Sequence, residues 1–145
     1  MAYPPRYVRY LNLPPIPDSV INTLNRDYTQ YEFTDSKIWS KSFNDSINEW
    51  CKKNICEDMY YAFQIIQKDV PIHKDNVTVT KINYIIDTGG PQVATRFWNE
   101  DRTEILQSEI LEPNRWHIMK VDVYHDVFNV EPGSTRFSIT GRVFE

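Results

Sequence analysis

From about residue 59 onward the chain alternates short runs of β-branched and aromatic residues with short runs of turn-forming residues. The expected strands are 59–66, 77–86, 92–98, 104–111, 116–124 and 136–144. They are separated by turn sequences at 87–91, 99–101, 112–114 and 131–134. Six or more short strands at this spacing, following two helices, predict a β-barrel or β-sandwich with a helical cover.

The first 58 residues have a different character. Five of the nine prolines precede residue 18, so this segment is expected to run extended over the surface. Asp18 then offers an N-cap for a short helix over 18–26, and a second helix is expected to begin near Asn44 or Asp45. Its apolar face would consist of Ile47, Trp50, Cys51 and Ile55. Nothing marks a domain boundary, so the expected organisation is a single domain, 1–145, with a proline-rich arm and flanking helices over 1–58.

Composition excludes several classes of protein. Hydrophobic residues make up 41% of the chain, enough for a core, yet no apolar run approaches the length of a membrane span. The amino terminus lacks the apolar segment of a secretory signal, so the expected location is the cytoplasm. Sixteen basic against twenty acidic residues give a net charge of −4, which argues against charge-driven binding to nucleic acid. Two cysteines are too few for a disulfide framework.

The last expected strand has two different faces. Its polar positions are Arg136, Ser138, Thr140 and Arg142, and they alternate with Phe137, Ile139, Gly141 and Val143. The apolar face can pack against the helices. The polar face, inside the mouth of a barrel, would form a ligand site.

A set of chemically active residues is spread along the expected strands. His73 and Asp75 form a His-x-Asp sequence, and His125 follows 52 residues after His73. Arg136 comes eleven residues later and is followed by Ser138. Two imidazoles and one carboxylate on one face of an octahedral ion leave three positions open. A keto acid fills two of these, dioxygen takes the third, and an arginine binds the far carboxylate of the keto acid through its guanidinium fork.

This pattern, His73-x-Asp75, then His125, then Arg136-x-Ser138, resembles that of the Fe(II)- and 2-oxoglutarate-dependent oxygenases, over about residues 59–145. The resemblance implies a double-stranded β-helix, a jelly-roll or cupin-like barrel, with the N-terminal helices packed on one face. It also implies that His73, Asp75 and His125 are the iron ligands and the catalytic centre. Arg136 and Ser138 would then bind the co-substrate 2-oxoglutarate. Halogenating relatives carry a small residue in place of the acid, so the presence of Asp75 favours hydroxylation.

Asn83 is a further candidate for binding the co-substrate. It lies eight residues after Asp75, so an unbroken strand would place both side chains on one face. The alternative is a structural amide that is hydrogen-bonded by the neighbouring backbone.

Two other functional classes remain open at this point. A cupin-type metal-binding barrel with another activity would normally use a third histidine, and His117 is the available one. A non-catalytic barrel could instead serve as an interaction module. The substrate of an oxygenase of this size would be a small molecule or a polypeptide side chain, and no membrane partner is expected. The sequence does not decide the oligomeric state.

Overall fold

The computed structural model describes residues 6–24, 39–75 and 79–142. In these ranges the chain forms two helices and ten strands. The helices are α1 (Asp18–Ile21) and α2 (Asp45–Asn54). The strands are β1 (Val8–Tyr10), β2 (Trp39–Phe43), β3 (Tyr61–Ile66), β4 (Val70–His73), β5 (Thr80–Thr88), β6 (Ala94–Trp98), β7 (Ile105–Glu109), β8 (Trp116–Lys120), β9 (His125–Phe128) and β10 (Arg136–Arg142).

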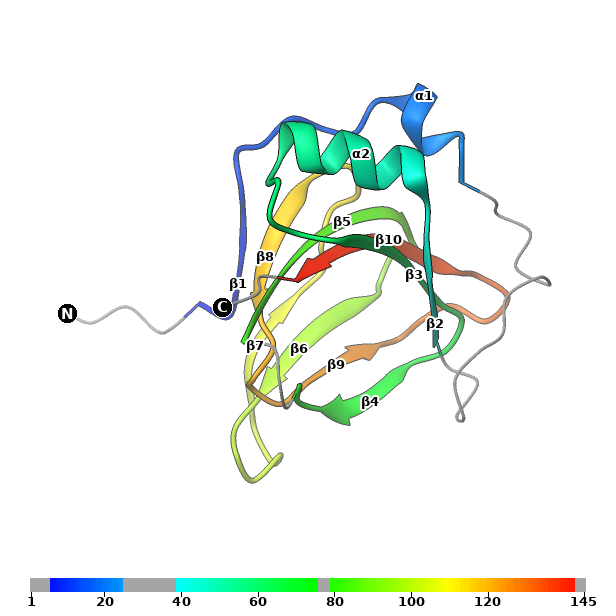
Figure 1. The fold of residues 1–145 in the computed structure, drawn as a ribbon. Helices are drawn as coiled ribbons and strands as arrows, with labels where there is room; N and C mark the ends of the chain where they lie inside the picture. The colour runs from blue at the N-terminus through cyan, green and yellow to red at the C-terminus, as the bar shows by residue number, and fades with distance from the viewer. Residues whose placement is uncertain (1–5, 25–38, 76–78, 143–145) are drawn as a thin grey trace.

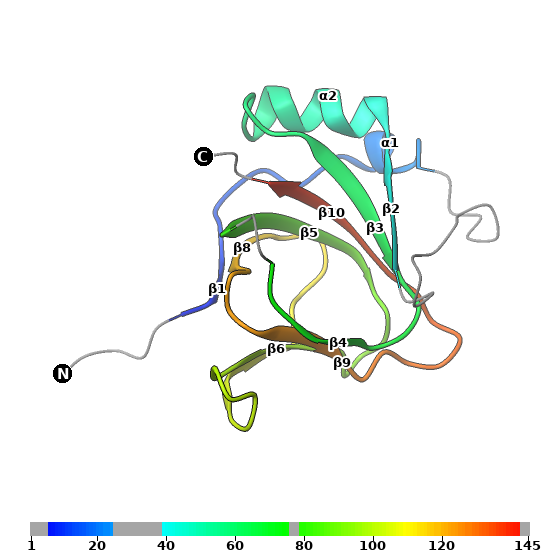
Figure 2. The ribbon, with the colours of Figure 1, turned by 60° about the horizontal axis from the view of Figure 1, so that its bottom comes forward.

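The strands form two antiparallel sheets that face each other. The six-stranded sheet has the order β1-β8-β5-β10-β3-β2, and the four-stranded sheet has the order β4-β9-β6-β7. In Figure 2 the strands β4, β9 and β6 lie opposite β5 and β8, with the interior of the barrel between them. The strand β10 lies at the centre of the larger sheet, paired with β5 on one side and β3 on the other.

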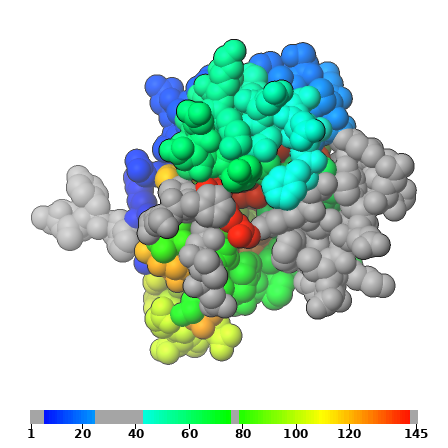
Figure 3. All heavy atoms as spheres, in the orientation of Figure 1, coloured from blue at the N-terminus to red at the C-terminus, as the bar shows by residue number. Residues whose placement is uncertain are grey.

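Both helices cover the outer face of the six-stranded sheet (Figure 1), and α2 forms the top of the molecule in the space-filling view (Figure 3). The helix α2 begins after Asn44, whose side chain accepts a hydrogen bond from the backbone of Ile47 at 3.0 Å. Ile47 and Cys51 are buried against the sheet, and Trp50 and Ile55 pack beside them, as predicted. Neither helix in the described ranges is long and apolar enough to cross a membrane.

The first helix departs from its prediction in two ways. The helix α1 ends at Ile21, well before the predicted end, because the next residues form a turn; residues 25 and 26 lie outside the described ranges. Pro17, not Asp18, occupies the N-cap position, and Asp18 is the first helical residue. A proline just before the first turn suits a helix start because its missing N–H would have no helical partner.

Six of the strands match the sequence prediction with shifted ends, and four were not predicted. The predicted strand 116–124 is shorter in the structure, because the chain leaves β8 after Lys120 and turns into β9. The missed strands are β1, β2, β4 and β9, which have three to five residues each. Runs this short give little alternation to detect, and β4 also contains Pro71. Residues 77, 78, 143 and 144 of the predicted strands lie outside the described ranges.

The alternation predicted for β10 is present and separates two environments. Phe137 and Ile139 belong to the large apolar cluster beneath the helices. Arg136, Ser138 and Thr140 are also buried but point to the opposite face, into the space between the sheets. A smaller apolar cluster of Val8, Ile85, Phe97 and Leu111 joins the sheets at the side of this space.

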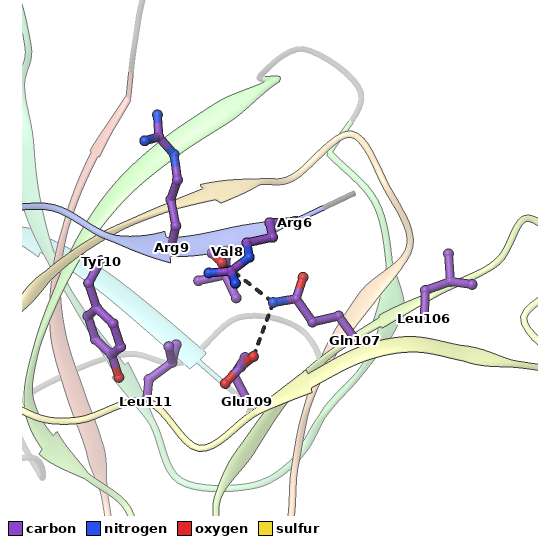
Figure 4. A pocket seen from close by; sticks show the side chains of 8 residues that line it. All are labelled: Arg6, Val8, Arg9, Tyr10, Leu106, Gln107, Glu109 and Leu111. Carbon is purple, nitrogen blue, oxygen red and sulfur yellow. Dashed lines mark hydrogen bonds between the residues drawn. The ribbon is translucent and has the colours of Figure 1, made fainter. Parts of the chain in front are cut away.

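The edge strands β1 and β7 meet and close the barrel on one side. The backbone N–H of Tyr7 donates to the side-chain oxygen of Gln107 at 2.7 Å. The amide nitrogen of Gln107 in turn lies near the carbonyl of Val8 and donates to Glu109 at 3.2 Å (Figure 4). These contacts line a surface hollow of about 310 Å³ beside β1 that contains none of the predicted site residues.

Candidate metal centre

The fold brings the three predicted metal ligands together. His73 is the last residue of β4 and His125 the first of β9, and the two residues are directly paired in the antiparallel ladder. Asp75 follows two residues after His73, and its backbone N–H donates to the carbonyl of Val121 at 2.9 Å. One ligand atom from each of the three side chains lies within 4.8 Å of the others. These three residues could therefore hold a metal ion.

Hydrogen bonds to the backbone orient both imidazoles. The Nδ1 atom of His73 lies 2.8 Å from the carbonyl of Pro71, and the Nδ1 atom of His125 lies 2.6 Å from the carbonyl of Val123. A carbonyl only accepts, so each ring carries its proton on Nδ1 and leaves the lone pair of Nε2 free. Each Nε2 lies 3.9 Å from the same oxygen, Oδ1 of Asp75. The lone pairs and this oxygen thus converge, as metal ligation requires.

The cluster lies between solvent and the barrel interior. The side chain of His73 is 44% exposed, whereas those of Asp75 and His125 are 17% and 8% exposed. Burial lowers the pKa of His125, and electrostatic interactions with His73 and Lys81 lower it further, against the raising effects of the Val123 carbonyl and Asp75. His125 is therefore a neutral imidazole at neutral pH, the form that binds metals.

Sequence reasoning missed one residue of this cluster, Lys81. The Nζ atom of Lys81, near the start of β5, lies 2.8 Å from Oδ2 of Asp75, and only 15% of its side chain is exposed. The sequence signal was its position on β5, two residues before Asn83 and four before Ile85, which both face the interior. A charged residue at such a position needs a partner inside the fold.

Arg136 is a buried cation in the interior. It is 6% exposed, and its Nη2 donates to the hydroxyl of Thr95 on β6 at 3.2 Å. No carboxylate among the described residues lies within ion-pair distance of it. Burial lowers the pKa of Arg136 to about 10, so it still carries its charge at neutral pH. A buried charge without a counter-ion is costly, and it fits a site whose ligand is an anion.

The pairing of β6 with β9 indicates how far the guanidinium of Arg136 lies from the candidate metal ligands. Thr95, which binds Arg136, pairs with Val127, while His125 pairs with Phe97. The two sites are thus two residues apart on neighbouring strands, about 7 Å along the sheet. Ser138 lies two residues after Arg136 on the same face of β10 and is 6% exposed. Arg136 and Ser138 therefore face the same interior as His125.

Asn83 also faces the interior, but the expectation that it shares an unbroken strand with Asp75 was wrong. Asp75 and Asn83 are not on one unbroken strand, because β4 ends at His73 and β5 begins at Thr80 in the other sheet. Asn83 is 9% exposed and donates to the thioether of Met119 at 3.1 Å, a weak acceptor.

His117 does not join the three clustered ligands. It lies on β8 opposite Asn83, and its ring makes an edge contact with Tyr10. Among the described residues, no third histidine lies with His73 and His125.

Comparisons with known proteins identify the fold but no family. No family model matches the chain, and no curated protein matches it. Among solved structures, a prolyl-4-hydroxylase from Pseudomonas putida aligns with a TM-score of 0.58 and 13% identity, over 94% of this chain and 91% of its own. EvdMO1 aligns with a TM-score of 0.54 and 13% identity, over 93% of this chain and 46% of its own. An oxalate oxidase in complex with glycolate aligns with a TM-score of 0.49 and 12% identity, over 83% and 58%.

The chain is a double-stranded β-helix. This confirms the predicted fold class, a mainly β jelly roll with N-terminal helices packed on one face. In this double-stranded β-helix the candidate ligands all belong to the four-stranded sheet or the loop after β4, and the buried arginine begins the central strand of the larger sheet.

Proposed function

We propose that the protein is an oxygenase of the hydroxylase type that depends on Fe(II), 2-oxoglutarate and dioxygen. The observation that supports this most is the pairing of two features inside one barrel. One is a cluster of two imidazoles and one carboxylate, His73, Asp75 and His125. The other is a buried arginine, Arg136, with no carboxylate partner among the described residues, about two strand residues away.

The donor set fits Fe(II). Two neutral imidazole nitrogens and one carboxylate oxygen, held on one side of the ion, are the ligands of non-haem Fe(II) oxygenases. Both Nε2 lone pairs are left free by the backbone carbonyls that bind the Nδ1 protons. When bound, the iron and the keto acid together would supply the oxidation of a substrate C–H bond with dioxygen.

The chain's own residues would bind and orient the co-substrate. Arg136 offers a charged fork to the far carboxylate, and burial makes this interaction stronger than it would be in water. Ser138 can donate its hydroxyl proton beside it. Asn83 can give up its weak contact with Met119 to bind the same molecule. The apolar cluster around Phe97 and Ile85 limits the entry of water from the side of β1.

The substrate would approach from the side of His73, which is the exposed ligand. We propose a small molecule or a polypeptide side chain, and the Pseudomonas putida neighbour, a prolyl-4-hydroxylase, makes peptidyl proline a reasonable first compound to assay.

The test is an anaerobic titration with Fe(II) and then 2-oxoglutarate, followed by the visible charge-transfer band of the chelated keto acid. Wild-type protein should develop the band only with both ligands. Arg136→Gln should need at least about tenfold more 2-oxoglutarate, because a charge-assisted bidentate contact is lost. Arg142→Gln, an exposed residue on the same strand, is the matched control and should titrate as wild type.

Two results would contradict the proposal. One is the absence of any band in wild-type protein whose circular dichroism and thermal unfolding show that it is folded. The other is equal affinity for 2-oxoglutarate in wild type and Arg136→Gln. Because Arg136 is buried, Ser138→Ala provides a second variant that removes a hydroxyl with little risk to folding; it should weaken 2-oxoglutarate binding in the same direction.

A further inference from the structure

Lys81 makes a close contact with one of the three candidate metal ligands. Its ammonium group lies 2.8 Å from Oδ2 of Asp75, and both side chains are largely buried. This is closer than the contacts of Asp75 with either imidazole nitrogen, which are both 3.9 Å. The strand β5 that carries Lys81 belongs to the larger sheet, whereas His73 and His125 belong to the smaller one and Asp75 to the loop after β4. The ion pair thus joins the larger sheet to the loop after β4 at the candidate metal centre.

The two oxygens of Asp75 have different partners. Oδ1 faces His73 and His125, at the point where their lone pairs converge. Oδ2 faces Lys81. A carboxylate arranged in this way can give a metal ion one oxygen while the other stays bound to the ammonium group. The contact therefore does not have to break when a metal binds.

The charge of Lys81 also matters for the metal. Asp75 supplies the single negative charge of the ligand set, and Lys81 cancels it, so a divalent cation would enter a site with no net negative charge. Both side chains are mostly shielded from water, which makes the repulsion between Lys81 and the metal ion stronger than on the surface. The same positive charge attracts an anionic co-substrate.

We propose that Lys81 is a positioning residue that holds Oδ2 of Asp75, so that this carboxylate gives the metal only one oxygen and leaves three coordination positions open. Its charge weakens metal binding and strengthens the binding of the keto acid. The part of this inference that concerns keto-acid binding rests on the proposed function, whereas the part that concerns metal binding does not depend on it.

The test compares metal binding and keto-acid binding in Lys81→Met. Co(II) affinity is measured by titration calorimetry, and 2-oxoglutarate affinity by the change it causes in the visible spectrum of the Co(II) protein. We expect Co(II) to bind at least about tenfold more tightly, because a like charge has been removed. We expect 2-oxoglutarate to bind at least about tenfold more weakly, because the freed Oδ2 competes for a coordination position and an attractive charge is lost. Opposite changes would not follow from simple damage to the fold, which would weaken both.

Three further variants sharpen the result. Lys74→Met removes the same charge from the residue between His73 and Asp75, but Lys74 is half-exposed and pairs with Glu100, so both affinities should stay as in wild type. Lys81→Arg keeps the charge and should stay near wild type in both. Lys81→Gln keeps a hydrogen-bond donor but not the charge, so it should bind Co(II) more tightly while the spectrum of its Co(II) complex stays like that of wild type.

The outcomes separate this inference from the proposed function. If wild type binds Co(II) but not 2-oxoglutarate, the proposed function fails, and Lys81 is then judged on Co(II) affinity and the Co(II) spectrum alone. If Lys81→Met leaves Co(II) affinity unchanged or weakens it in folded protein, the inference on Lys81 is wrong. If wild type binds no metal, both are wrong.

Discussion

At the scale of single residues, burial lowers the pKa values of several ionisable side chains in the barrel interior. His117 is 1% exposed. Burial, together with the charge of Arg136, lowers its pKa to about 3, against the raising effect of the Arg115 carbonyl. His117 is thus neutral in the folded protein over the whole range in which an exposed histidine titrates.

This gives a prediction for stability against pH. The pKa of His117 is lower in the folded than in the unfolded chain, so the unfolded chain binds the proton first. Stability from this residue is complete above about pH 6.5 and is lost as the pH falls toward 3. Between pH 7 and pH 5 the loss should be about 2 kcal/mol of unfolding free energy.

Urea unfolding of wild type and His117→Gln at both pH values, with a chelator present, measures this effect. The variant should lose less stability than wild type between pH 7 and pH 5. An unchanged difference in His117→Gln would show that the burial of His117 does not cause the acid sensitivity.

Single residues also show what the sequence could and could not predict. His73, Asp75, His125, Arg136 and Ser138 were predicted because their residue types and spacing suit one kind of chemistry. The contact of Lys81 with Asp75 could not be predicted, because it depends on how the loop after β4 lies against β5 of the other sheet.

At the scale of elements, the side chain of Asn44 contributes both to the start of α2 and to its position. Asn44 accepts a hydrogen bond from the backbone of Ile47, and its amide donates to the carbonyl of Thr23 at 3.3 Å. It thereby caps α2 and ties it to the turn after α1. The sequence predicted the start of α2 from this residue type, but it missed the contact with Thr23 because the intervening residues give no local signal.

Asn44→Ala should therefore destabilise the protein by about 1 kcal/mol, the usual cost of losing a side-chain N-cap. Thermal or urea unfolding measures the change. Lys53→Ala, in the last turn of the same helix and exposed, should stay within about 0.5 kcal/mol of wild type. Because α2 lies on the outer face of the larger sheet, Asn44→Ala should leave Co(II) affinity unchanged. A change in metal affinity would mean that the helix and the candidate metal centre are coupled.

At the scale of the whole molecule, a metal ion would join parts of the chain that are far apart in sequence. His73 ends β4, Asp75 lies in the following loop, and His125 begins β9. A ligand that binds only the folded chain stabilises it by an amount that grows with the logarithm of the ligand concentration, and reaches about 2.7 kcal/mol at one hundred times the dissociation constant.

Saturating Co(II) should thus raise the melting temperature of the wild-type protein, and a chelator should reverse the change. His125→Gln should lose the increase, because it removes a nitrogen ligand that is 8% exposed and oriented by a backbone carbonyl. An increase of the same size in His125→Gln would place the bound metal elsewhere on the molecule.

The central place of β10 has a consequence for how the protein is made. This strand pairs with β3 and β5, which were synthesised some fifty or more residues earlier, and it supplies Arg136. Until residue 142 has left the ribosome, β3 and β5 each have an open edge where β10 will later insert. Two strand edges that could pair with other chains therefore stay exposed during translation, and the insertion of β10 completes the larger sheet and buries Arg136 at the same time.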